Sequence, residues 1–505
     1  MSDILEREDT AQMSQKQREG VLVAPRDRLS ADQVKLIDGI SRELLQDPGV
    51  LCYNAEAVAF FKQAGAIIED GDDCPRVRFP DWLVDAALKS APSKVVLGAR
   101  EPGNRLVLDA EEPRVRFGSG AETNIWLDVR FENEVPKYTR ESGSVRRLRE
   151  SAHICDQLEH LDFFIRNVNI QDPEITGENK DVNQFYTSLN NITKHVQAGL
   201  TSLDAIDDIV QMGQMVAGGA AAFQQEPVLS FITCVIKSPL QFVDDTTKKL
   251  IEISRRRVPV VISSCPMGGA TGPFDEFAMV AQINAELLAG IVLNQLVSSG
   301  APVLYGAVPV RTRLDNLNDM YAAAEFVHYN VDCAQMARYY RLPCYSTAGV
   351  GDSSTPGIQA TIEKMLTLSN VPQAGAQYMH YAFGLLERTN VFCPEQAILD
   401  DAQIDLIKHT LQSTEVDPAD RDQVLSQIRE VMASSHKTFM YNLPLPSRDP
   451  VYTCFPLEDE DHGALYAAHC RRRELLESPR NQMPTDLRED ISRHVPNLLI
   501  KTFNE

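Results

Sequence analysis

Between Pro259 and Leu296 the chain passes from a short apolar run through small residues into a long amphipathic pattern. The run from Val260 to Ile262 is typical of a strand buried on both faces. A glycine-rich turn that includes Cys265 follows, and one helical face then carries Phe277, Ala281, Leu288, Val292 and Leu296. Glycines let a ligand approach the backbone closely. In parallel α/β folds, the turn between strand and helix is where chemistry is placed.

The same unit recurs along the chain. The predicted strands are 115–118, 163–169, 195–198, 229–235, 260–263, 303–305, 344–346 and 377–380. Helical patterns separate them, with one face formed by Val243, Thr247, Leu250 and Ser254 and another by Ile358, Ile362 and Met365. Eight alternating units predict the α/β class and a closed (β/α)8 TIM barrel. An open doubly wound sheet also alternates, but residues 117–120 do not complete the phosphate-binding glycine fingerprint that such a sheet usually carries.

The patterns outside the barrel divide the rest of the chain. Residues 1–27 are polar and are expected to be disordered or loosely packed. Residues 28–112 predict a mainly helical N-terminal extension that opens on Ser30 as an N-cap, with short strands in 76–83 and 95–108. The barrel is expected over 113–410. Residues 411–505 predict a C-terminal helical extension, with helical patterns near 422–434 and 462–476.

The composition of the chain argues against several classes of protein and of binding partner. The 505 residues carry a formal net charge of −22, which argues against nucleic acid as the main partner because phosphate recognition needs a basic surface. Apolar runs stay well short of the roughly 20 residues of a membrane span. The first residues lack the apolar core of a signal peptide, so we expect a cytoplasmic protein. Ten cysteines without a CxxC pair predict reduced thiols rather than a disulfide scaffold.

Polar residues stand at or just after the predicted strands. The set comprises Glu122, Asn167, Asn169, His195, Cys265, Met267, Tyr305, Asp352 and His380. In a barrel, such positions at the carboxyl ends of the strands face the active site. Each residue alone has a structural alternative, such as capping a helix or bonding a neighbouring loop. Motifs for zinc proteases, P-loops, nucleophile elbows and dinucleotide sites are missing from the sequence, so a metal bound by the protein itself is not expected.

Several segments resemble the trimethylamine methyltransferase family, in its branch without pyrrolysine. They include VLCYNAEAVAFFKQAGA, RFPDWLVDAALKSAP, RVRFGSGAE, PMGGATGPF, NAELLAGIVLNQLVSSGAPVLYG and ARYYRLPCYSTAGVGDSSTPGIQATIE. The glycine-rich turn with its following helix, and the Leu-Tyr-Gly strand end, are the most specific of these. They span most of the chain, and the branch includes the glycine betaine:corrinoid protein methyltransferases.

The resemblance implies a TIM-barrel enzyme of one-carbon metabolism, as in methanogenesis. Such enzymes bind a methylated amine and dock a separate corrinoid protein, whose reduced cobalt, Co(I), takes the methyl group. The corrinoid (cobalamin) belongs to that partner, and no cofactor is bound permanently. Pyrrolysine lies in the segment corresponding to GVGDSSTPGIQA, where this chain has ordinary residues near Thr355. The resemblance therefore implies a quaternary amine as substrate: glycine betaine first, then proline betaine, carnitine or γ-butyrobetaine.

The implied chemistry assigns roles to the polar residues at the ends of the predicted strands and to nearby aromatic residues. Aromatic faces and a carboxylate suit a trimethylammonium group, which has no proton to donate. The candidates for substrate binding are Glu122, Trp126, Asn167, Asn169, His195, Tyr305 and Phe383, with Phe185 and Tyr186 as further aromatic candidates. Asp352 and His380 are the candidate catalytic residues. The turn formed by Cys265, Met267, Gly268 and Gly269 is expected to face the corrinoid.

Two other readings remain open from the sequence. One is a barrel hydrolase or lyase that uses Asp352, His195 and His380 as acid–base groups. The other is a catalytically silent homologue that binds amines. Cys265 as a nucleophile is disfavoured, because no histidine is placed by the sequence to activate it. A homo-oligomer is compatible with the composition but is not indicated by any motif.

Overall fold

A computed structural model describes residues 18–412, 417–439 and 463–499. Its centre is a curled sheet in which eight strands run parallel, hydrogen-bonded in the order β7, β21, β20, β17, β15, β12, β11, β10. They are β7 (Arg114–Phe117), β10 (Phe163–Ile165), β11 (His195–Ala198), β12 (Leu229–Thr233), β15 (Val260–Ser264), β17 (Val303–Ala307), β20 (Cys344–Thr347) and β21 (Tyr378–His380). All eight strands predicted from the sequence are confirmed.

The two outer strands of the parallel series approach each other. Gly118, just after β7, forms an isolated parallel bridge with Phe163 of β10. The backbone N–H of Asp162 donates to the carbonyl of Phe117 over 2.7 Å, and the Asp162 carboxylate accepts from the Phe117 N–H. A short strand, β1 (Val21–Leu22), adds antiparallel to β7. Residues 18–27 are thus tied to the sheet, so the prediction of a loose terminus is wrong for them; residues 1–17 lie outside the described residues.

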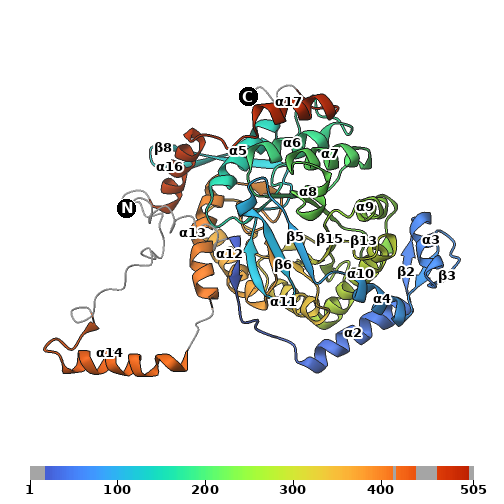
Figure 1. Cartoon of the computed structure of the whole chain (residues 1–505), viewed down its shortest axis with the longest axis horizontal. Coiled ribbons are helices and arrows are strands. Elements are labelled where there is room, and N and C mark those ends of the chain that lie inside the picture. Colours follow the sequence, from blue (N-terminus) through green and yellow to red (C-terminus); the bar gives the residue numbers. More distant parts are fainter. Residues whose placement is uncertain (1–17, 413–416, 440–462, 500–505) are drawn as a thin grey trace.

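Helices surround the sheet (Figure 1). They are α5 (Val145–Gln157), α6 (Lys180–Asn191), α7 (Ile206–Val216), α8 (Ala220–Gln225), α9 (Asp244–Arg255), α10 (Glu276–Val297), α11 (Ala324–Tyr339), α12 (Ile358–Asn370) and α13 (Pro394–Leu411), with short 3-10 turns at Pro102–Asn104, Leu203–Ala205, Pro372–Ala374 and Pro418–Asp420. The predicted α9 and α10 are confirmed. In α12 the apolar residues Ile358 and Ile362 point outward, 83% and 63% exposed.

Helix α10 is the longest element around the sheet and sits in the core. By length and composition alone it could cross a membrane, but 83% of its most apolar window is buried inside the protein. It packs against α2 (Ala31–Gln46), α4 (Asp81–Ser90), α9 and α11. Ser41 of α2 donates its hydroxyl to the Ala281 carbonyl over 2.9 Å. Its apolar composition therefore reflects burial between layers of this fold.

The N-terminal extension packs beside α10. Ser30 caps α2 through a reciprocal bond with Gln33, which confirms the predicted helix start. Helix α3 (Ala55–Gln63) packs on β2 (Val50–Cys52) and β3 (Ile67–Glu69). These two strands belong to a separate five-stranded sheet with β4 (Arg76–Arg78), β13 (Ile236–Lys237) and β14 (Gln241–Phe242). The predicted strand over 76–83 ends early, because α4 begins at Asp81 after Pro80. Proline favours the start of a helix, where its missing N–H costs nothing.

A hairpin covers the amino ends of the parallel strands, which we call the amino edge. Strands β5 (Lys94–Leu97) and β6 (Leu106–Asp109) pair antiparallel, as the sequence predicted for this segment. Val95, Leu97, Leu106 and Leu108 form one apolar cluster with Phe163 and Tyr378 inside the curled sheet. Figure 1 shows the hairpin lying across the centre of the ring of helices. One end of the sheet is therefore closed by an apolar plug.

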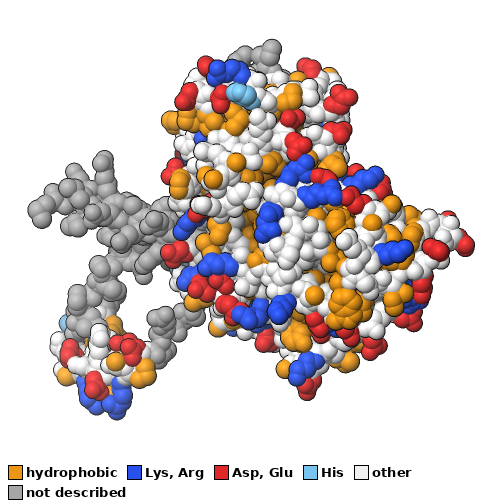
Figure 2. Space-filling view, turned by 45° about the vertical axis from the view of Figure 1, so that its right-hand side comes forward, with side chains coloured by type: hydrophobic (Ala, Val, Ile, Leu, Met, Phe, Trp, Pro, Cys, Tyr) orange, Lys and Arg blue, Asp and Glu red, His pale blue; other side chains and the backbone are white. Residues whose placement is uncertain are grey.

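The opposite end, the carboxyl edge, carries the additional elements. Small sheets are formed by β8 (Ile125–Glu132), β9 (Val135–Ser142), β22 (Leu385–Leu386) and β23 (Val391–Phe392), and by β16 (Met267–Gly268), β18 (Val310–Thr312) and β19 (Asp319–Met320). In the C-terminal region, α14 (Arg421–Ala433), α16 (Ala464–Glu477) and α17 (Thr485–His494) follow. Helix α16 packs on α13 and α5, whereas α14 lies apart from the body (Figures 1 and 2). Acidic and basic side chains are interspersed over the face in Figure 2.

Candidate functional site

Two cysteines meet at the carboxyl edge, directly after β12 and β15. The Sγ atoms of Cys234 and Cys265 lie 3.3 Å apart, and the Oγ of Ser263 is 2.9 Å from the first and 3.5 Å from the second. Both side chains are exposed. Hydrogen bonding to Cys265 lowers the pKa of Cys234 to about 7, and Ser263 assists. The shared proton raises the pKa of Cys265, so this thiol pair favours a single negative charge.

Three tyrosines stand around the thiol pair. Tyr345 belongs to β20, Tyr381 follows β21, and Tyr321 lies just before α11. The rings of Tyr321 and Tyr381 are 6.3 Å apart and edge to face. Burial raises the pKa of Tyr381, and the neighbouring Tyr321, Cys265, Cys234 and Glu122 raise it further. Tyr381 is therefore within electrostatic reach of both thiols and of a carboxylate, and stays a neutral phenol.

Glu122 presents a carboxylate at the same edge. Its Oε2 pairs with Nη2 of Arg166 over 2.9 Å, and its Oε1 accepts from the Gly199 N–H over 2.8 Å. The Glu122 side chain is 30% exposed, whereas that of Arg166 is 2% exposed. Asn169 donates its amide to the backbone carbonyl of Glu122. The carboxylate is thus held by two groups and the backbone of the residue by a third, while the side chain stays 30% exposed.

The backbone at this edge adopts conformations that non-glycine residues rarely take. Ala121, Glu122 and Tyr381 have φ angles of 96°, 49° and 70°. Such left-handed conformations cost free energy and persist only where the surroundings enforce them. They tend to cluster at functional sites. Two of the three residues are the carboxylate and the tyrosine described above, so the strain coincides with the concentration of polar groups.

Asp352 holds the loop that carries Tyr321. Its carboxylate accepts from the backbone N–H groups of Tyr321 and Ala322 over 3.0 and 3.1 Å. Burial raises the pKa of Asp352, and these two bonds oppose the rise. Glu363 of α12 in turn accepts from the backbone N–H groups of Asp352 and Ser353. In the structure Asp352 is therefore a positioning residue for an aromatic side chain.

His380 ends β21 and is completely buried. Its Nδ1 lies 2.7 Å from the Ser346 carbonyl, its Nε2 lies 3.4 Å from the Thr347 hydroxyl, and its ring stacks on Tyr345 at 4.0 Å. Desolvation lowers the pKa of His380 to about 3. The imidazole is neutral at neutral pH, with Nδ1 as the donor to the carbonyl. It supports the Tyr345 and Tyr381 rings from within the sheet.

Several predicted site residues lie elsewhere. His195 begins β11, so it sits at the amino edge, where its ring bonds the Gly98 carbonyl and the Ser230 hydroxyl over 2.7 Å each. The prediction that it stands at a carboxyl end is wrong. The strand assignment was right, but the histidine is its first residue rather than its last. Burial lowers the pKa of His195 to about 4.

The predicted aromatic cage residues are core residues. Trp126 is fully buried in β8 between Phe392 and the guanidinium groups of Arg147 and Arg472. The remaining predicted residues in this class are Tyr305, bonded to Asn284 of α10, Phe383, packed in the main core, and Phe185 and Tyr186, buried on α6. Asn167 faces α5, where it accepts from Ser151. Strand alternation and helix packing turn these side chains away from the carboxyl edge.

The glycine-rich turn lies where the sequence placed it, after β15. Met267 packs in an apolar cluster with Tyr321 and Tyr381. A side chain at Gly268 would meet the Tyr329 hydroxyl at 2.7 Å and would have to displace it, and Gly269 has a φ of 91°, where any side chain strains the backbone. Thr355 lies in the loop between β20 and α12, and its carbonyl accepts from the Ser353 hydroxyl.

Sequence reasoning missed Cys234, Arg166, Tyr321, Tyr345 and Tyr381. Four of these lie within or directly beside predicted strands, so the predicted strands gave the signal that could have found them. Tyr381 directly follows His380, and Tyr345 lies within the predicted strand 344–346. Tyr321 does not lie near a predicted strand. It belongs to the long connection between β17 and α11, which folds back over the sheet. Within the described ranges, no group of three His, Cys, Asp or Glu is placed to hold a metal ion.

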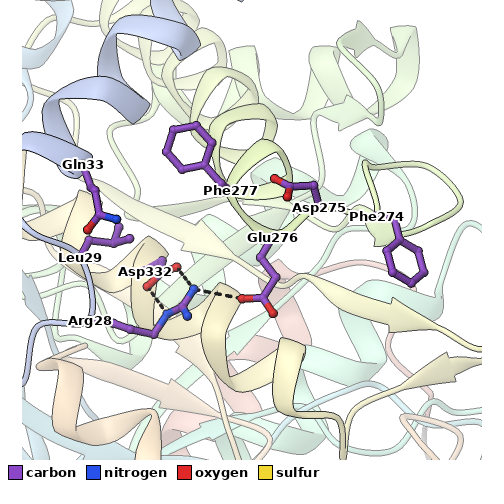
Figure 3. A pocket seen from close by; sticks show the side chains of 8 residues that line it. All are labelled: Arg28, Leu29, Gln33, Phe274, Asp275, Glu276, Phe277 and Asp332. Atoms are coloured by element: carbon purple, nitrogen blue, oxygen red, sulfur yellow. Dashed lines mark hydrogen bonds and ion pairs between the residues drawn. The ribbon is translucent and has the colours of Figure 1, made fainter.

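A separate crevice opens beside α2 and the start of α10, with a volume of about 490 Å³. Arg28 reaches across it to Asp332 and Glu276, over 2.6 and 3.1 Å (Figure 3). His328 also pairs with Glu276. Phe274 lies on the far side of Glu276, under the guanidinium of Arg311. The charged groups of the crevice thus satisfy one another, which makes it a weaker candidate than the carboxyl edge.

A parallel α/β sheet with strained, polar and aromatic residues at its carboxyl edge defines an enzyme-like site of the α/β class. The family model for trimethylamine methyltransferases matches residues 5–440. The chain belongs to the trimethylamine methyltransferase family.

The relatives bear two different substrate names. A trimethylamine methyltransferase from Desulfitobacterium hafniense is 31% identical over 385 residues, covering 75% of this chain and 74% of the relative. Another from Methanosarcina mazei is 28% identical, covering 77% and 76%. A glycine betaine methyltransferase from Desulfitobacterium hafniense is 25% identical over 398 residues, covering 78% and 79%.

Proposed function

We propose that this protein moves a methyl group from a quaternary amine, glycine betaine or a related betaine, to the Co(I) corrinoid of a separate protein. One observation carries the proposal. The carboxyl edge brings Tyr321, Tyr381, a thiol pair and the half-buried carboxylate of Glu122 close to one another. Aromatic faces and negative charge recognise a cation that has no proton to donate. The family and the relative named for glycine betaine support the same class of substrate.

The proposed reaction needs few catalytic groups from the protein. A quaternary nitrogen already carries the positive charge that makes the amine a leaving group, so no general acid is required. The partner's corrinoid supplies the nucleophile for the methyl carbon. The protein holds the methyl group in line and keeps water out. A neutral His380, with its pKa lowered to about 3 by burial, fits this division because it offers no proton near neutrality.

Glu122 and Arg166 are the proposed electrostatic centre. Glu122 faces the ammonium, and its position depends on the ion pair with Arg166 and on the Gly199 N–H. The Nε and Nη1 groups of Arg166 have no partner among the described residues. Both groups are buried, so they are not open to a substrate carboxylate. The preference for a betaine over trimethylamine rests instead on the ordinary residues near Thr355, where pyrrolysine lies in the family.

The scaffold for this function is, in our proposal, a complete (β/α)8 barrel over 113–410. The bridge between Gly118 and Phe163 and the bonds around Asp162 support closure between β7 and β10. Residues 28–112 then supply the plug at the amino edge, and 411–505 form a helical extension. The turn with Cys265, Met267, Gly268 and Gly269, and Thr355 in the β20–α12 loop, would rim the mouth toward the corrinoid protein.

The direct test is methyl transfer with purified components. The protein is mixed with a reduced corrinoid protein and with glycine betaine, proline betaine, carnitine, γ-butyrobetaine or trimethylamine, and the loss of the Co(I) absorption band is followed. We expect loss with at least one betaine and none with trimethylamine. Consumption of a betaine without any corrinoid protein would contradict the proposal and favour a hydrolase or lyase. Binding of betaines without change in the Co(I) band would favour a silent homologue.

A further inference from the structure

The thiol pair differs from every other described cysteine in its access to solvent. Cys234 and Cys265 are exposed, Cys470 is half-buried, and the remaining ones are enclosed in the core: Cys52, Cys74, Cys155, Cys333, Cys344 and Cys393. Among the described cysteines, these two therefore offer the most surface to a small reagent, although many protein atoms surround them. They also meet each other, with their Sγ atoms 3.3 Å apart. A disulfide bond has a length of about 2.05 Å, so the two Sγ atoms need to move only a short distance toward each other to become bonded.

The surroundings of the pair favour a reactive thiolate. Ser263 lies within 2.9 Å of Cys234 and 3.5 Å of Cys265, and it provides a hydroxyl that can donate to the charged sulfur. With Cys265 as the other donor, the pKa of Cys234 falls to about 7, whereas the pKa of Cys265 rises. The thiolate is the nucleophile in thiol–disulfide exchange, and a partner thiol within reach resolves the first product.

We propose that Cys234 and Cys265 form a reversible disulfide at the carboxyl edge, and that it switches the enzyme off. The Cys234 thiolate attacks one sulfur of a low-molecular-weight disulfide and expels the other sulfur as a thiolate. Cys265, losing its proton, then attacks the Cys234 sulfur and releases the second small thiolate. The pair gives up two electrons and two protons, and the small disulfide becomes two thiols. A dithiol reductant reverses the sequence.

The expected loss of activity rests on the proposed function. The thiol pair lies beside Tyr321, Tyr345 and Tyr381, where its ionisation is coupled to theirs. A disulfide is neutral, so it removes a negative charge from the place where a quaternary ammonium binds. It also ties the end of β12 to the turn after β15, which fixes the glycine-rich segment. Cobalt stays as Co(I) only under strongly reducing conditions, so an enzyme that stops when thiols are oxidised avoids holding substrate without an acceptor.

The first experiment measures the bond and needs no activity. Reduced protein is equilibrated with oxidised glutathione, alkylated, digested and mapped by mass spectrometry. We expect a linked peptide pair containing Cys234 and Cys265, the loss of two titratable thiols, and full recovery with dithiothreitol. The variant C344S, altered at a buried cysteine, should behave in the same way. C265S should instead keep glutathione on Cys234. Wild-type protein that keeps both thiols free, or that keeps glutathione on Cys234, overturns the proposal.

The second experiment measures the consequence. Corrinoid methylation with the best betaine is compared before and after oxidation. We expect at least a tenfold loss for wild type, restored by dithiothreitol, and less than a twofold loss relative to its own reduced form for C234S, which lacks the attacking thiolate. A disulfide that forms without reducing the rate overturns the switch. If reduced wild type methylates no corrinoid at all, the proposed function fails, while the mapping still decides whether the disulfide exists.

Discussion

The two edges of the parallel sheet show how one fold separates structure from chemistry. At the amino edge, the β5–β6 hairpin fills the opening with apolar side chains, and both ring nitrogens of His195 are bonded. At the carboxyl edge, two thiols are exposed and the side chain of Glu122 is 30% exposed. The amino edge is therefore filled and internally bonded, whereas the carboxyl edge presents polar groups to solvent.

Two of the buried histidines, His195 and His380, make the difference concrete. Burial lowers the pKa of both, His195 to about 4 and His380 to about 3. His195 bonds the plug, whereas His380 stacks on Tyr345 and lies 3.8 Å from the ring of Tyr381. A perturbed pKa alone therefore does not mark a site in this protein. The edge of the sheet on which the residue stands is the better guide.

The largest expected effect is at the carboxylate. Glu122→Gln keeps the shape of the side chain but removes its negative charge, so it should lower kcat/KM for the best betaine on the order of 100-fold. The matched control Glu112→Gln, an exposed residue paired with Arg114 near the amino edge, should change kcat/KM by less than twofold. Steady-state rates of corrinoid methylation measure both. Equal rates for Glu122→Gln and wild type would break the proposed difference between the edges.

A smaller effect is expected where the loop of Tyr321 is held. In the wild type, the two carboxylate oxygens of Asp352 each accept a hydrogen bond, one from the Tyr321 N–H and one from the Ala322 N–H. The variant Asp352→Asn keeps only one oxygen that can accept these bonds. We expect kcat/KM to fall about 30-fold, with a rise in KM, because a misplaced ring costs binding rather than proton transfer. The pH profile should keep its shape. A lost ionisation in the profile would instead show that Asp352 acts as an acid or base.

The aromatic wall is tested by removing one ring. Tyr381→Leu should weaken betaine binding about tenfold, the range expected for a desolvated cation–π contact. Tyr381→Phe keeps the ring and should stay within threefold of wild type. Calorimetric titration of the reduced protein measures both affinities. If both variants bind like wild type, Tyr381 is not part of the cation site.

The smallest effect concerns stability in acid. In the folded protein, the two buried rings stay neutral down to about pH 3 or 4, whereas in the unfolded chain each ring binds a proton below about pH 6.5. The contribution of the neutral rings to the unfolding free energy is therefore complete above pH 6.5 and falls as the pH decreases. Each histidine should cost about 1 kcal/mol of unfolding free energy between pH 8 and pH 6. His195→Gln should flatten this slope in urea unfolding without lowering kcat/KM more than twofold. A tenfold loss of activity would place His195 in the site after all.

The strands and helices with a periodic hydrophobic pattern could be predicted from the sequence, whereas the loops that fold back over the sheet could not. The eight strands, α9 and α10 followed from apolar runs and helical spacing, since burial on both faces leaves a strong pattern. Pattern alone did not say which strand residue comes last, so His195 was placed at the wrong edge. It also did not show that Ile358 and Ile362 of α12 face outward. Tyr321 reaches the site through tertiary contacts with Asp352, which no local pattern encodes.

Replacing the nitrogen of the ligand by carbon tests the central claim most directly. Glycine betaine and 3,3-dimethylbutyrate share shape and carboxylate, but only the first carries a positive charge. Their affinities for the reduced protein are measured by calorimetric titration in one buffer. A site built to hold a proton-free cation binds glycine betaine at least tenfold more tightly, and Glu122→Gln removes most of that difference. Equal affinity for the two ligands would contradict the account.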